Sequence, residues 1–148
     1  MKQYLILISI LFLSISSHAQ AFITVQDGPT TYSVHISFTK ADFSGIFIVR
    51  DKGNEIVGTL VNEFGIKAFD FSFDKSKSKC KLLNVIQMMD KWYIRRIIGA
   101  DLSVLFRDSN TKKQLKRRRI TKDEDIIEML NIKTNIRYKI KPLHETNR

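Results

Sequence analysis

The chain has 148 residues, with 25 Lys and Arg against 15 Asp and Glu, a formal net charge of +10 at pH 7, one Cys and three His. This length suits a single domain with a modest core. A lone Cys leaves no partner for an internal disulfide, and the few His and Cys have no spacing typical of a metal site. We therefore expect one small, basic domain that holds neither a metal nor a cofactor.

The first 19 residues have the three parts of a secretory signal peptide. Lys2 provides the positive start, residues 4–13 are largely apolar, and Ser17-His18-Ala19 places small residues where a signal peptidase reads. The apolar run is shorter than the roughly 20 residues that a membrane span needs. We expect cleavage after Ala19, export, and one mature domain over residues 20–148, without a lipid anchor because no Cys lies near the cleavage point.

Alternating side chains predict an antiparallel meander over the first half of this domain. The expected strands cover residues 22–26, 32–38, 45–51, 55–61, 66–73 and 80–86, separated by turns rich in Gly, Asn and Pro. The fifth strand carries Phe69, Phe71 and Phe73 on one parity, and therefore presents a row of phenyl rings on one face. Cys80, in an alternating run, is interpreted as a small inward-facing apolar residue.

The second half mixes helices and strands. Ile94, Ile97 and Ile98 fall at helical spacing, so we expect a short helix that ends at Gly99, followed by a second short helix capped by Asp101. Beyond them the pattern predicts a charged strand over residues 112–120, a capping box over 121–124, a helix over 126–130 and a last strand over 136–140. This order of elements predicts an α+β fold dominated by antiparallel sheet.

Several of these residues resemble a known family. Phe43-Ser44-Gly45 before Ile46-Phe47-Ile48-Val49, then residues 62–70 (NEFGIKAFD), and then residues 91–106 occur in the order and at the spacing typical of the outer-membrane lipoprotein carrier and receptor (Lol) superfamily. The match is to its small, receptor-like members and covers roughly residues 40–106.

The resemblance implies a curved, incompletely closed half barrel in the periplasm, with short helices over an apolar concave face that takes acyl chains of lipids or lipoproteins. Each buried methylene would contribute about 0.8 kcal/mol to such binding. The alternative is that the rings pack against the helices and leave no empty space. The expected wall and lid are Phe43, Ile46, Ile48, Phe69, Phe71, Phe73, Trp92, Ile94, Ile98 and Leu102.

A basic run lies in the carboxyl-terminal third, where residues 107–148 hold 13 Lys and Arg against 6 Asp and Glu. Export and the absence of interleaved aromatic residues argue against nucleic acid. Among possible partners, anionic lipid head groups are the better candidate. The commoner explanation of such a run is a solvated edge strand kept from aggregating by its charges. The expected contacts are Lys112, Lys113, Lys116, Arg117, Arg118 and Arg119.

The sequence contains no nucleophile elbow, phosphate loop or dinucleotide fingerprint. We therefore expect a protein that is not an enzyme. We also expect a monomer. Two hypotheses follow: a periplasmic carrier or accessory factor that binds acyl chains, and an envelope interaction protein that uses its basic third against an anionic surface or partner.

Overall fold

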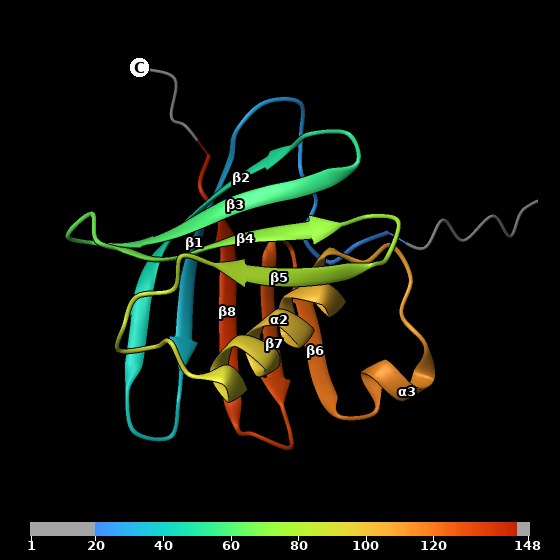
Figure 1. Cartoon of the computed structure of the whole chain (residues 1–148). Coiled ribbons are helices and arrows are strands. Elements are labelled where there is room, and N and C mark those ends of the chain that lie inside the picture. Colours follow the sequence, from blue (N-terminus) through green and yellow to red (C-terminus); the bar gives the residue numbers. More distant parts are fainter. Residues whose placement is uncertain (1–19, 145–148) are drawn as a thin grey trace, which may run out of the picture.

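The structure, a computed structural model, describes residues 20–144, and the signal peptide expected over residues 1–19 lies outside them. An eight-stranded antiparallel sheet curls around helix α2 without closing (Figure 1), which confirms the α+β class and the half-barrel shape. The strands are β1 (Thr30–Ser37), β2 (Asp42–Asp51), β3 (Glu55–Asn62), β4 (Lys67–Asp74), β5 (Lys79–Leu83), β6 (Arg118–Asp123), β7 (Ile126–Asn131) and β8 (Ile136–Pro142).

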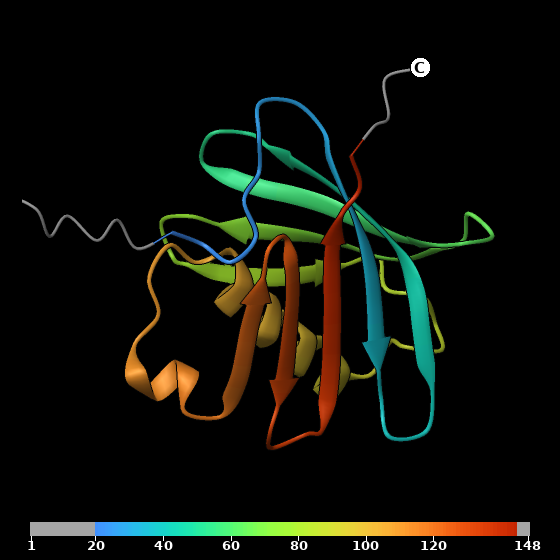
Figure 2. The same cartoon turned by 180° about the vertical axis from the view of Figure 1, so that it is seen from behind.

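The strand order explains where the helix lies. Across the sheet the order is β5-β4-β3-β2-β1-β8-β7-β6, so β1 is central and pairs with both β2 and β8. The two edge strands, β5 and β6, are joined in the chain by the segment that carries α2 (Trp92–Phe106) and α3 (Lys112–Leu115). Because this connection must pass from one edge to the other, α2 crosses the concave side of the sheet, and Figure 2 shows it behind β6, β7 and β8.

Side-chain alternation places the core between the concave face and α2. Ile36, Phe47, Leu60 and Phe69, on four successive strands from β1 to β4, are each 0% exposed. Helix α2 adds the fully buried side chains of Ile98, Leu102 and Leu105 to the same apolar cluster. The sheet is therefore apolar on its inner face and largely polar on its outer face.

The expected first strand, residues 22–26, does not join the sheet. This segment passes the end of α2 instead, where the amide of Ile23 donates to the carbonyl of Leu105 at 3.0 Å and the Tyr32 hydroxyl donates to the carbonyl of Thr24. The last carbonyls of a helix lack partners within the helix, which gives the segment a hydrogen-bonding site there. The apolar residues of this segment contribute to the core, because Ile23 is 1% exposed.

The charged strand expected over residues 112–120 begins only at Arg118, and the expected capping box over 121–124 and helix over 126–130 are wrong. Helix α3 takes up the beginning of the basic run, opened by a capping box between Thr111 and Gln114. Residues 118–131 form the β6–β7 hairpin, with Glu124 in the turn at a φ of 51°. Ile127 and Met129 alternate toward the core on β7, so pairing with the free edge of β8 outweighs local helical spacing.

The expected pair of short helices is one continuous helix. Gly99 and Asp101 are both buried inside α2, and neither ends nor begins it. Gly99 serves close packing instead, since a Cβ placed there would lie 3.1 Å from the carbonyl oxygen of Cys80 on β5. A larger side chain would hold the helix away from the edge strand.

This close approach predicts the effect of enlarging the residue. Gly99→Leu should destabilise the fold by about 1–3 kcal/mol, because the added side chain overpacks the contact between α2 and β5. Ala100→Leu is the matched control, since Ala100 is exposed on the same turn of the helix. Urea unfolding measures both variants, and equal stability of the two would contradict the role given to Gly99.

Candidate functional site

The phenyl rings of β4 are packed core and do not line an open cavity. Phe69, Phe71 and Phe73 are 0, 1 and 3% exposed. The ring centroids of Phe71 and Phe73 lie 5.4 and 6.0 Å from that of Phe106 at the end of α2, and Phe47 meets Phe71 edge-on at 5.4 Å. Over most of the half barrel the structure therefore matches the alternative in which the rings pack against the helix.

The expected wall residues of β2 are divided between the two faces. Ile46 and Ile48 lie on the outer face, 37 and 45% exposed, so their assignment to the inner wall is wrong. The reason is parity, because they alternate with the buried Phe47 and Val49. Phe43 shares the parity of Phe47 and packs, half-buried, against the core.

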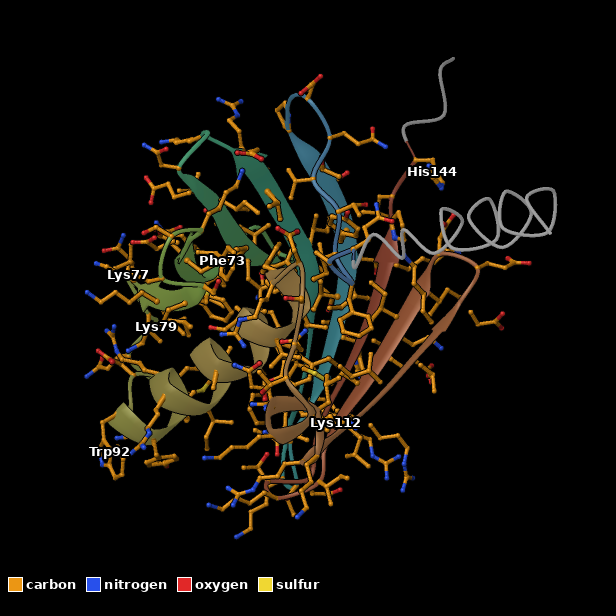
Figure 3. All side chains as sticks on the ribbon, turned by 90° about the vertical axis from the view of Figure 1, so that its right-hand side faces the viewer. Phe73, Lys77, Lys79, Trp92, Lys112 and His144 are labelled. Atoms are coloured by element: carbon orange, nitrogen blue, oxygen red, sulfur yellow. The ribbon has the colours of Figure 1, made fainter. Side chains whose placement is uncertain are left out.

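The expected lid residues are also divided, with some facing the core and one facing solvent. Ile98 and Leu102 are 0% exposed and face the sheet, and Ile94 is half-buried against the same core. Trp92 is 73% exposed and points away from the molecule at the beginning of α2 (Figure 3), so its place on the inner side of the lid is wrong. The first turn of the helix extends past the edge of the core.

An open cleft of about 480 Å³ lies at one end of the half barrel, where the segment 20–25 passes the carboxyl-terminal end of α2. Its apolar lining is contributed by segments far apart in the chain: Ile23, Val25, Ile56, Phe73 and Phe106. Of the expected wall and lid residues, Phe73 is the one that lines this cleft.

The rim of the cleft is charged. Lys75 bonds to both carboxylate oxygens of Asp51, at 2.7 and 2.8 Å, and this bonding holds the pKa of Asp51 below its ordinary value. Arg107 donates to the carbonyl of Ser78 and to Asn110 Oδ1, and burial lowers the pKa of its guanidinium. The cleft therefore combines a floor of apolar side chains, most of them almost fully buried, with a polar, charged rim that also includes Asp108. Such a mixed lining suits a ligand with one oily end and one polar end.

A buried polar cluster, the Asp101 cluster, fastens α2 to the carboxyl-terminal half of the sheet. The Asp101 carboxylate, 0% exposed, accepts from Arg118 Nε at 2.9 Å, from Asn131 Nδ2 at 2.9 Å and from the Tyr138 hydroxyl at 2.6 Å. The three donors lie on β6, β7 and β8. Burial raises the pKa of Asp101, against the opposing effect of these donors, and burial also raises that of Tyr138.

The other side of α2 is bonded to β5. Ser103 Oγ accepts from the amide of Cys80 at 2.7 Å, and Arg95 Nη1 donates to the carbonyl of Leu82 at 3.0 Å. The helix is thus hydrogen-bonded to both edges of the open sheet. Cys80 is buried as expected, and burial raises the pKa of its thiol to about 12.

The basic run is split by the alternation of β6. Arg118 turns inward to Asp101 and its side chain is 13% exposed, so its expected contact with head groups is wrong. The other five members of the run are exposed, and Figure 3 shows Lys112 at the lower end of the molecule. They are Lys112, Lys113, Lys116, Arg117 and Arg119.

The sequence alone does not group Ile23, Asp51 and Arg107 in one site, because only the fold brings their segments together.

Within residues 20–144, no group of three or more His, Cys, Asp or Glu could hold a metal ion. In the same part of the chain, no helix has the length and apolar character needed to cross a membrane. Comparisons with family models, curated proteins and solved structures find no match.

The Asp101 cluster predicts a large loss of stability when its acid is removed. Asp101→Ala should lower the free energy of unfolding by about 3–5 kcal/mol, because it leaves the Arg118 charge buried without its partner. Asp90→Ala is the control, since it breaks the exposed pair with Arg95 and should change stability little. Chemical denaturation followed by circular dichroism measures both, and similar losses would contradict the anchoring role.

Proposed function

We propose that this protein is a non-catalytic, periplasmic acyl-chain-binding protein, a carrier or accessory factor in the trafficking of lipids or lipoproteins. The observation that carries the proposal is the cleft of about 480 Å³ with its apolar floor and charged rim. Its size falls within the roughly 300–1,000 Å³ of ordinary ligand sites. The resemblance of residues 40–106 to the Lol superfamily and the expected export support the same assignment.

In this proposal an acyl chain lies along Ile23, Phe73 and Phe106, with its polar end near Lys75 and Arg107. Each methylene that leaves water contributes about 0.8 kcal/mol, and an open cleft buries only part of a chain. The donor and acceptor membranes have equally apolar interiors, so the net free energy of transfer between them is small. Moderate burial at the end of the barrel therefore favours both loading and release.

The floor of the cleft gives a direct test. Val25 lines the cleft and is half-buried, so Val25→Asp should weaken binding of a fluorescent fatty acid at least about tenfold, equivalent to roughly 1.4 kcal/mol. Native mass spectrometry of protein purified without detergent should show an adduct of lipid mass on the wild type that the variant lacks.

Val57→Asp is the matched control, because Val57 is also half-buried but lies on the outer face of β3, opposite Arg50 on β2. It should bind the fatty acid as the wild type does. A wild type that carries no lipid and binds no fatty acid would refute the proposal.

The filled interior favours a second candidate function, an envelope interaction protein that uses its basic carboxyl-terminal third on an anionic membrane surface. Phe69 and Phe71 leave no room for a ligand beneath α2. Five basic residues of the run from Lys112 to Arg119 are exposed to solvent. Basic side chains near an anionic bilayer each contribute about 1 kcal/mol, and salt screens this attraction.

This candidate predicts salt-sensitive binding to vesicles that contain phosphatidylglycerol. Replacing Lys112, Lys113, Lys116 and Arg117 together by Gln should weaken cosedimentation at least about a hundredfold at low salt, because four charges are lost. Arg118 is kept, since it holds Asp101. The control replaces four other exposed lysines by Gln: Lys40, Lys52, Lys77 and Lys79. Equal loss in both variants would mean that only net charge matters.

A further inference from the structure

The outer face of the sheet carries a second cleft, of about 430 Å³, over β6, β7, β8 and β1, the face that Figure 2 turns toward the viewer. It lies on the opposite side of the sheet from the packed core. Its basic side chains are Arg119, Arg137 and Lys139. Two of these lie outside the basic run that the sequence singles out, so only strand pairing reveals the cluster.

Strand register places the two arginines on either side of one apolar residue. Arg119 on β6 is opposite Leu130 on β7, and Leu130 is opposite Arg137 on β8. Neighbouring strands are about 4.8 Å apart, so the two arginine backbones are separated by about 10 Å, a gap that two long side chains can close over Leu130. Lys139 follows Arg137 by two residues and therefore stands on the same face.

The two guanidinium groups have N–H donors that are not used within the protein. Within residues 20–144, neither Arg119 nor Arg137 forms an ion pair or a side-chain hydrogen bond. One acid lies in the cleft, Glu128, and its carboxylate is 3.3 Å from Lys139 Nζ. Three cations and one carboxylate leave the cleft positively charged.

A histidine ring and hydroxyl groups complete the lining. His35 lies beside Lys139 in the register of β1 and β8, and its ring is held between two hydroxyls, with Nδ1 2.7 Å from Ser44 Oγ and Nε2 3.1 Å from Ser37 Oγ. Thr121 brings a further hydroxyl from β6. A guanidinium fork pairs through two parallel hydrogen bonds with a carboxylate or a phosphate. Two forks with a Lys and hydroxyls around them offer more donors than one carboxylate can use, so they suit a phosphate, which has more acceptor oxygens.

We propose that this outer cleft binds a phosphate group, either free or as the head group of a phospholipid, through Arg119, Arg137 and Lys139. This proposal refines the second candidate function. It shares with that function only the expectation that the ligand is negatively charged. It uses none of the residues that line the cleft for acyl chains.

The test is a nuclear magnetic resonance titration of the ¹⁵N-labelled full chain with inorganic phosphate at constant ionic strength, with acetate as a parallel arm. Phosphate should shift the amides of residues 35–37, 119–121 and 137–139, and acetate should shift them less. Arg119→Gln with Arg137→Gln should weaken phosphate binding about tenfold or more. Arg137→Lys, which keeps the charge but loses the fork, should weaken it by an intermediate factor.

Lys112→Gln with Lys113→Gln is the control, because it removes two exposed charges from α3, outside the cleft. Its phosphate affinity should stay within about twofold of wild type. Equal weakening in both double variants, or shifts confined to α3, would overturn the proposal.

Vesicles containing phosphatidylglycerol separate the two sources of phosphate. Vesicle binding that is lost in the Arg119 and Arg137 double variant supports a lipid head group. Phosphate binding without vesicle binding supports a free phosphate and refutes the surface function. Vesicle binding with no phosphate shift in the cleft overturns the outer site and leaves the surface function standing.

Discussion

The half barrel depends on the carboxylate of Asp101. A buried charge is tolerated only when it is paired and hydrogen-bonded, and Asp101 has a guanidinium, an amide and a phenol as donors from three different strands. On its other side α2 is bonded to β5 through Ser103 and Arg95. The helix therefore joins β5 to β6, β7 and β8, which share no strand pairing with it. A sheet held in this way can stay curved without closing into a barrel.

This arrangement decides where the fold leaves open space. A helix tied to both halves of the sheet cannot leave the concave face without breaking the Asp101 cluster, and its side chains fill the space that the fold would otherwise offer. Phe71 shows how tightly the space is filled: a Cβ on Gly58 of the neighbouring strand would lie 2.4 Å from its Cζ. Room is left at the open end of the half barrel, beside Phe73 and Phe106, and on the outer face of the sheet.

Much of the sheet could be predicted from the sequence, because alternation and turn residues are local signals. The strands from β1 to β5 and the last strand, β8, follow the pattern closely, and the row at Phe69, Phe71 and Phe73 is buried as its parity requires. The errors have a common cause in contacts between distant residues. The sequence predicts a helix end at Gly99, but this residue packs closely against β5 inside the helix. It predicts a helix cap at Asp101, but this side chain accepts hydrogen bonds from Arg118 and Tyr138. The open cleft could not be predicted, since segments far apart in the chain form it.

The basic run shows how a sheet redistributes charge that is contiguous in sequence. A strand turns alternate side chains to opposite faces, so consecutive arginines on β6 cannot all serve one surface. Arg118 goes to the core, where its charge is balanced by Asp101, and Arg119 goes to the outer face, where β8 adds Arg137 and Lys139 from residues nearly twenty positions away. The run is therefore neither a single patch nor a mere solvated edge. One member stabilises the fold, and another joins a cluster that only strand pairing assembles.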